Sequence, residues 1–567
     1  MKKKLLYGAA ALVLLAAVAV AAILIFVPSG CDISYTVLSY DAQEGSIRFA
    51  LDISDLGGNA NVALYVGDVA FSDVKCSVGR LAAEMDEVSD VIELEAEGGR
   101  ISLTYTAWLG WPGKHGLQGA ATDSYLAFEG GNVFLMPDRC FDAETKHVRR
   151  LSARYELPDG WTAVTPFSMG EGGEALAELE WPSWNEIYVF RKSAFVFGAL
   201  APLPGFARVM LAPGEAGGLS EDTHQGFEAL YAYFDGLMGE ADREPPTFVI
   251  LPQTEDGDYI LAGAGGDSIA ATFSAQNARD WELLGHRLFH AYFESRVKDV
   301  SFHAAPKLWF YEGLACYYEL QSVQSLPPQV KQDAGIGEGD PFQKLFAQFV
   351  YMRFKDPALL ALIPLDEESY SWAGALVEFL HYTQAPLIVR VLEDQSVQSF
   401  GEADRPMRYI LSHQEDADIP LRRILEYALG DDRLFWNDYV AGAEIPPLWR
   451  PVPESGDSQY IEGICNEIEH TLWTWFVMDI SSYPEEPADI AQSLSLLDLA
   501  RGSSFTDEKT ERRISESLPT VYALLKARAY RAEFLGLRYD DPELRFRFIE
   551  EDNLELWNEI TGEGGGG

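Results

Sequence analysis

The chain has 567 residues, 47% of them hydrophobic, and a formal net charge of −45, because 88 Asp and Glu residues outnumber 43 Lys and Arg residues. A chain of this length and apolar content folds into several domains with buried cores, which excludes intrinsic disorder as a description of the whole. The negative charge excludes nucleic acid and anionic lipid surfaces as natural partners, since both require basic protein surface.

The N-terminus has the pattern of a membrane anchor. A short lysine cluster precedes an apolar run from Leu5 to Val27, which is long enough to cross a bilayer and longer than the apolar core of a cleaved signal peptide. We predict an anchor over residues 1–30 that enters the membrane through residues 5–27. Lysines that flank a membrane segment stay on its cytoplasmic side. We therefore predict a single-pass protein with a cytoplasmic N-terminus, whose remaining residues are extracytoplasmic. A cleaved signal peptide and a lipoprotein attached through Cys31 are the alternatives.

The five cysteines show no CxxC spacing and no disulfide framework. Cys76 and Cys140 are the pair that we consider for a single disulfide, which an oxidising exterior would permit.

The residues after the anchor read first as strands and then as helices. Segments such as SIRFALDIS and RISLTYTAW, within 31–212, are rich in β-branched and aromatic residues and are separated by Gly, Pro and Asp turns. Near Pro213 the residue pattern changes from strand-like to helical. A helix is predicted over Leu219–Gly239, and a strand follows over Thr247–Leu251. Residues 450–567 read as a helical extension that ends in a disordered glycine tail.

Two histidines and a glutamate define a candidate metal site. His286 and His290 are four residues apart on a helix predicted to begin near Arg279, so they lie on one face and can bind a single ion. Glu312 follows on a second apolar segment. Two imidazoles and a carboxylate, with one position left for water, are the ligand set of a catalytic zinc. The string is HRLFH, however, whereas metallopeptidases with this pattern read HExxH and use the glutamate as general base.

The segment around Glu312, LWFYEGLACYYE, resembles the second helix of the glycyl-aminopeptidase-like gluzincins, a metallopeptidase family in which this glutamate is the third zinc ligand. Further segments resemble that family in its own order, and together they span residues 33 to 449. They are TDSYLAFEGGNVFLMP, LPDGWTAVTP, YSWAGALVEFL and LFWNDYVAGAEIPPLW.

The resemblance implies an α+β fold, zinc bound by His286, His290 and Glu312, and a peptide or protein as the bound partner. The implied parts are a β-sandwich-like domain, a thermolysin-like metallopeptidase-type domain and a helical subdomain. Their ranges are 31–212, 213–385 and 386–449.

Three departures from the family pattern concern the chemistry. Arg287 occupies the position of the general base, and a guanidinium stays protonated at physiological pH, so it cannot accept a proton from water. Ser371 stands where the family has the tyrosine that stabilises the oxyanion, and Tyr370, one place away, is the candidate donor. The substrate-gripping strand corresponds to a stretch that contains Gly266 and Asp267, where the family glutamate is missing.

Arg287 allows two arrangements. In one, it pairs with Glu312 in place of the metal, and zinc is lost. In the other, it points outward, zinc is retained, and the guanidinium serves as a clamp for a peptide carboxylate. If Arg287 points where the family glutamate would, its positive charge close to a dication weakens metal binding.

Glu282 and Glu294 lie four residues before His286 and four after His290, on one stripe of the helix. Their spacing suits carboxylates that hold an imidazole in one tautomer, and partly solvated carboxylates are the alternative.

The altered base position favours a membrane-anchored, catalytically impaired peptidase-fold protein that binds peptides or a partner. An active zinc-dependent peptidase with a substitute base is the first alternative, and a cell-surface structural or interaction protein is the second. Whether the chain is an enzyme stays open at this stage.

Overall fold

A computed structural model describes most of the chain between residues 30 and 440. The described ranges are 30–56, 60–67, 69–82, 91–110, 112–113, 116–141, 147–167, 174–214, 219–239, 246–252, 260–261, 268–337, 341–342, 345 and 380–440. The predicted anchor and the helical extension over 450–567 lie outside these ranges. Within them, no helix is long and apolar enough to cross a membrane.

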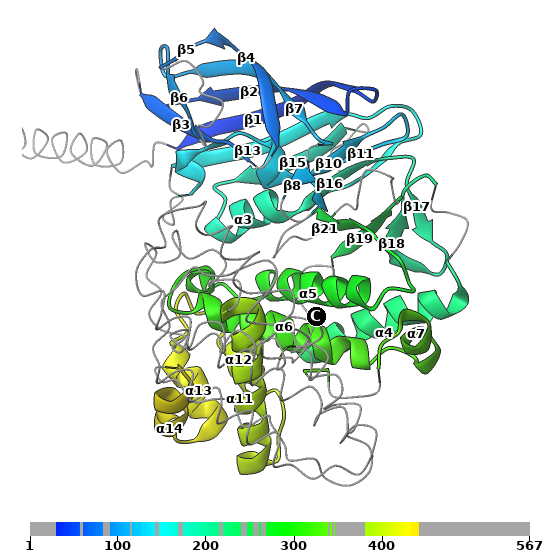
Figure 1. Cartoon of the computed structure of the whole chain (residues 1–567). Helices are drawn as coiled ribbons and strands as arrows, with labels where there is room; N and C mark the ends of the chain where they lie inside the picture. The colour runs from blue at the N-terminus through cyan, green and yellow to red at the C-terminus, as the bar shows by residue number, and fades with distance from the viewer. Residues whose placement is uncertain are drawn as a thin grey trace, which may run out of the picture. The chain divides into compact units, whose positions relative to one another are not determined.

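The chain up to Arg296 forms one compact unit, and most of it is sheet (Figure 1). Its largest sheet has six strands in the order β15-β13-β1-β2-β7-β4. The strands are β1 (Cys31–Asp41), β2 (Ser46–Ser54), β4 (Ala70–Val78), β7 (Ile101–Trp108), β13 (Val148–Glu156) and β15 (Glu174–Glu180).

The core of this sheet follows from the alternation of apolar and polar residues. In β7 every second side chain is buried, which places one face of the strand in the core. Phe49 of β2 lies directly opposite Tyr105 of β7, and the two rings stack with centroids 5.2 Å apart. Such cross-strand aromatic pairs fix the register of antiparallel strands. The predicted β-rich region is therefore confirmed.

Two four-stranded sheets and a short hairpin complete the β-rich part. One sheet has the order β10-β11-β16-β14, with β10 (Gly119–Ala121), β11 (Tyr125–Glu129), β14 (Thr162–Val164) and β16 (Ala194–Gly198). The other has the order β12-β3-β6-β5, with β3 (Asn61–Tyr65), β5 (Arg80–Leu81), β6 (Val91–Glu95) and β12 (Met136–Pro137). The remaining elements are β8 (Pro112–Gly113), β9 (Gly116–Leu117), α2 (Gly130–Val133), η1 (Asp138–Cys140) and α3 (Trp184–Lys192).

A five-stranded sheet of order β17-β18-β19-β21-β20 follows in the same unit. Its strands are β17 (Ala201–Leu203), β18 (Phe206–Leu211), β19 (Thr247–Leu251), β20 (Ile260–Leu261) and β21 (Ser268–Thr272). Helices α4 (Glu221–Met238) and α5 (Ala278–Glu294) lie on the same side of this sheet (Figure 1). The helix, strand and His-bearing helix predicted from the sequence are confirmed. The boundary predicted at residue 213 falls inside this sheet, because β17 and β18 already belong to it.

The described cysteines are all free. The disulfide considered between Cys76 and Cys140 is therefore wrong: Cys140 is buried in the core, whereas Cys76 lies half-exposed on β4. Cys31 is fully buried, and its backbone N–H donates to the His147 carbonyl at 2.8 Å.

The helices from Val297 onward form a second compact unit. Helix α6 (Leu308–Gln324) is buried on nearly all sides, as expected for a helix that is apolar all round. The other helical segments are η2 (Val300–His303), α7 (Pro328–Ala334), the π-helix η3 (Leu380–Gln384), α11 (Ala385–Phe400), α12 (Arg405–Ser412), α13 (Leu421–Leu429), α14 (Arg433–Phe435) and the π-helix η4 (Trp436–Val440).

A buried ion-pair network fixes the segment that precedes α6. Lys307 Nζ donates to Asp299 Oδ2 at 2.8 Å, to Asp418 Oδ1 at 2.7 Å and to Ser301 Oγ at 2.7 Å. Asp299 Oδ2 also accepts the Ile419 N–H at 2.7 Å. Burial raises the pKa of Asp299, but the hydrogen bonds from Lys307, Ser301 and Ile419 outweigh it, so the pKa lies below its usual value.

Glu393 is a buried carboxyl group on α11. Its Oε2 accepts the Asp404 N–H at 2.9 Å, and its Oε1 has no hydrogen-bond partner within the part of the chain that the structure describes. Burial, together with the nearby Asp404 carboxylate, raises the pKa of Glu393 from 4.5 to about 8. Glu393 is therefore protonated in the folded chain at neutral pH.

Replacing Asp299 leaves the Lys307 ammonium buried without its main counter-ion. We expect Asp299→Asn to lower the free energy of unfolding by about 3 kcal/mol, since breaking a buried pair is costly. Urea unfolding followed by circular dichroism measures this. The control is Lys298→Ala, which removes the exposed pair with Glu415 and should cost less than about 1 kcal/mol. Equal effects of the two variants would contradict the structural role of the buried pair.

The raised pKa of Glu393 makes stability depend on pH. Between about pH 4.5 and pH 8 the unfolded chain holds this carboxylate ionised while the folded chain keeps the proton, so Glu393 makes the folded state less stable as pH rises through this window. Glu393→Gln keeps the acceptor for Asp404 and cannot ionise. We expect its urea midpoint to fall less between pH 5 and pH 8 than that of the unaltered chain.

The control for this measurement is Glu426→Gln, which changes a carboxylate paired with Arg423 near the surface. Its pH dependence should match that of the unaltered chain. The same slope for Glu393→Gln and for the unaltered chain would show that Glu393 is already ionised in the folded state.

Candidate metal centre

Helix α5, which carries both histidines, has a well-defined start. Asn277 caps it by accepting the Arg279 N–H at 3.0 Å, and Asp280 Oδ2 accepts the Ser274 N–H at 2.7 Å. Asn277 satisfies a backbone donor that the first helical turn leaves free, and Asp280 binds the segment before the helix. The acidic group also suits the positive end of the helix dipole.

The rotation of α5 is set by a close contact with α4. Trp281 is fully buried, and its Nε1 donates to the Ala275 carbonyl at 3.0 Å. Gly226 of α4 faces this ring: a Cβ there would lie 2.6 Å from Trp281 Cη2, so only glycine fits. Further along, Tyr292 OH donates to Asp235 Oδ1 at 2.7 Å. Two contacts three helical turns apart hold α5 in one orientation.

His286 and His290 meet at their Nε2 atoms. Both side chains are buried, with 8% and 0% of their surface exposed, and the two Nε2 atoms are 3.0 Å apart. On a tetrahedral zinc with Zn–N bonds of 2.0–2.1 Å, two imidazole nitrogens would be about 3.3 Å apart. The pair is therefore arranged as two ligands of one ion would be.

Glu312 lies on the buried helix α6. A carboxylate that is only 7% exposed is unusual in a globular protein unless it is paired or binds a metal. His286, His290 and Glu312 are thus three buried residues of types that bind metals. Neutral imidazoles with one carboxylate are a donor set that zinc accepts, so the residues fit the ion that the sequence pattern implied.

Cys316 and Glu319 are two further buried residues of ligand type, each 5% exposed. They follow Glu312 by four and seven residues, so all three fall on one face of α6. This helical spacing from Glu312 is visible in the sequence, but our predicted site residues did not include Glu319.

Arg287 forms no ion pair with any residue that the structure describes, and its buried Nε has no hydrogen-bond partner there. The arrangement in which Arg287 pairs with Glu312 in place of a metal is therefore absent from the described residues. Its side chain is half-buried at the position next to His286. A permanent positive charge thus stays close to the histidine pair.

Glu282 and Glu294 occupy different surroundings. Glu282 pairs with Arg279 Nη1 at 3.2 Å near the surface, whereas Glu294 is buried at the end of α5. Their predicted role in holding the imidazoles stays a prediction. Tyr370, Ser371, Gly266 and Asp267 lie outside the described residues.

His381 is a residue that the sequence did not indicate. It lies in the π-helix η3 and is only 3% exposed. Burial lowers the pKa of His381, and the negative charge of Glu312 opposes that shift, which places the two side chains within electrostatic reach of each other. His381 lies far from Glu312 along the chain, so no residue spacing in the sequence indicates a relation between the two side chains.

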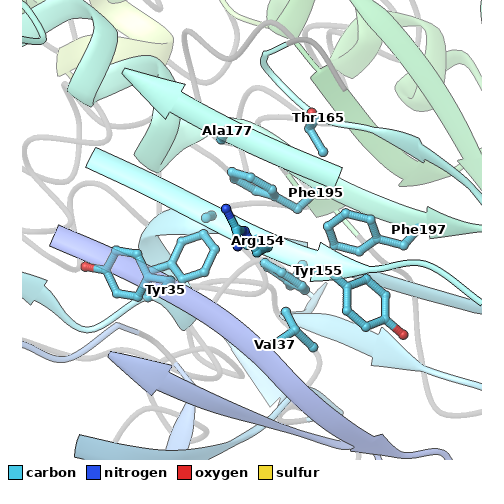
Figure 2. Close-up of a pocket in the computed structure, with 11 residues that line it drawn as sticks. Tyr35, Val37, Arg154, Tyr155, Thr165, Ala177, Phe195 and Phe197 are labelled. Atoms are coloured by element: carbon cyan, nitrogen blue, oxygen red, sulfur yellow. The ribbon is translucent and has the colours of Figure 1, made fainter. Parts of the chain in front are cut away.

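A small cavity lies elsewhere, in the β-rich part. Figure 2 shows Tyr35, Tyr155, Phe195 and Phe197 among its lining residues. It has room for about one water molecule, so it is not a peptide-binding site.

Comparison with known proteins concerns the fold. No family model matches the sequence, and no curated protein matches it. Among solved structures, the chain is similar to an aminopeptidase N family protein from Idiomarina loihiensis. The two are 12% identical, the match covers 76% of this chain and 78% of that one, and the TM-score is 0.52.

An M1 zinc metallopeptidase from Deinococcus radiodurans is also similar. Its mutant form bound to a Tyr-Ser-Ala substrate is 15% identical, with 75% of this chain and 97% of that chain covered and a TM-score of 0.44. Another structure of an M1 zinc metallopeptidase from Deinococcus radiodurans is also 15% identical, with the same coverage and a TM-score of 0.41. The Idiomarina match shows that this chain has an aminopeptidase N-like α+β fold, which confirms the gluzincin-type fold predicted from its motifs.

Proposed function

We propose that His286, His290 and Glu312 bind one zinc ion. The observation that carries the proposal is the 3.0 Å approach of the two buried Nε2 atoms. Two imidazole nitrogens at this distance repel if each carries a proton, and a shared cation removes that conflict. When bound, zinc would polarise a water molecule or a peptide carbonyl.

The bound partner in this proposal is a peptide or a segment of a protein, held without efficient turnover. Peptide hydrolysis needs a group that takes a proton from water, and Arg287 at that position cannot. Loss of a positioned base removes a factor of about 10² to 10⁴ in rate. The aminopeptidase-like fold supports peptide recognition, while the guanidinium next to His286 favours binding over cleavage.

An active peptidase is the second candidate, and Glu319 favours it. Its carboxylate is buried on α6, seven residues after Glu312 and on the same face of the helix, so it is our candidate to replace the missing base. In this reading Glu319 accepts the proton that the family glutamate would take.

The cellular setting is part of the proposal. Lys2 to Lys4 and the apolar run 5–27 support a single-pass anchor with the N-terminus in the cytoplasm. The strongly acidic remainder suits an extracytoplasmic surface, where it keeps the protein soluble.

Zinc content tests the metal site directly. Elemental analysis of the full-length protein in detergent should find about one zinc per chain, and His290→Ala should lose it because one of three ligands is removed. The control is His224→Ala, a change on α4 that should leave the zinc content unaltered. A folded, unaltered protein without zinc would contradict the proposed site.

Restoring a carboxylate at position 287 tests the impairment. We expect Arg287→Glu to raise hydrolysis of short peptides and aminoacyl anilides at least ~100-fold, because it supplies a general base. Arg287→Gln removes the positive charge without supplying a base, so it should strengthen zinc binding and leave hydrolysis low.

Arg287→Glu and Arg287→Gln together distinguish the effect of removing the positive charge from the effect of supplying a general base. If Arg287→Glu raises neither zinc content nor hydrolysis, position 287 is not what limits the site, and Ser371 becomes the next position to change. Efficient hydrolysis by the unaltered protein would instead favour the active peptidase.

A further inference from the structure

Helix α6 touches the start of α11 next to the proposed zinc ligand. A Cβ added at Gly313 would lie 2.9 Å from Ala385 Cβ and 3.0 Å from the Ala385 carbonyl carbon. Only a glycine permits this approach. The backbone beside Glu312 is therefore held directly against the first residue of α11.

The five residues before Ala385 form the π-helix η3. A π-helical turn holds an additional residue, which rotates its side chains relative to the register of the α-helix that follows. Such insertions occur often at functional sites. His381 lies in this turn, four residues before Ala385, and is almost completely buried.

Glu312 directly precedes Gly313, and His381 lies four residues before Ala385, so the close contact of Gly313 with Ala385 brings η3 beside the part of α6 that carries Glu312. Both side chains are buried. The negative charge of Glu312 opposes the lowering of the His381 pKa by burial, which agrees with this placement.

We propose that His381 is a positioning residue, which fixes the Glu312 carboxylate by donating an imidazole N–H to it in the zinc-bound state. The proposal rests on the zinc site proposed above. A carboxylate ligand can rotate about its terminal bond, and a donor from a rigid neighbour restricts that rotation. Loss of such a partner typically weakens metal binding 10–100-fold.

The test is the zinc affinity of full-length His381→Phe and His381→Gln, measured by competition with a chromophoric chelator. Phenylalanine fills the buried volume without a donor, so we expect zinc binding about 10–100-fold weaker. Glutamine supplies an amide N–H and should recover part of the loss. The visible spectrum of the Co²⁺-substituted protein should change in His381→Phe, because the geometry of the carboxylate ligand changes.

The control is His413→Phe, which alters a histidine stacked on Tyr409 in the same unit and should leave affinity and spectrum unchanged. Zinc affinity of His381→Phe within about twofold of the unaltered protein, with an unchanged Co²⁺ spectrum, would overturn the positioning role alone. An unaltered protein that binds no zinc would overturn the zinc site itself, so the two failures are distinguishable.

Discussion

The structure around α5 has to accommodate two buried imidazole nitrogens that lie only 3.0 Å apart. At that distance they can share one proton or one cation, but they cannot each carry a proton without strong repulsion. A cation bound to both nitrogens would remove this repulsion. Arg287, directly after His286, carries a permanent positive charge where metallopeptidases with this motif have a glutamate.

The meeting of the two nitrogens depends on how α5 is held. A helix turns by about one hundred degrees per residue, so a small rotation would separate the ring nitrogens from a common target. The close contact of Trp281 with Gly226 prevents rotation at one end, and the Tyr292 hydrogen bond to Asp235 prevents it at the other. The approach of the two ring nitrogens thus depends on the packing of α5 against α4 as well as on the histidines themselves.

Features encoded by short-range spacing were predictable from the sequence. The four-residue interval placed His286 and His290 on one face, and alternating apolar residues identified the β-rich region. β17 and β18 have the same strand-like composition as the strands before them, yet β18 pairs with β19 beyond residue 213, and such long-range pairing leaves no signal in local composition. His381 escaped prediction because its approach to Glu312 depends on long-range packing of η3 against α6. The role of Glu282 is equally hard to predict from sequence, because its ion pair with Arg279 near the surface competes with any role toward His286.

The position of β1 has a mechanical consequence. This strand lies in the interior of the six-stranded sheet, parallel to β13 on one side and antiparallel to β2 on the other. Tension applied to the segment before Gly30 pulls along β1, so it loads two hydrogen-bonded ladders in shear, and many bonds must break together before the strand slides. A tether at this end would therefore transmit force into the most extensively paired part of the β-rich region.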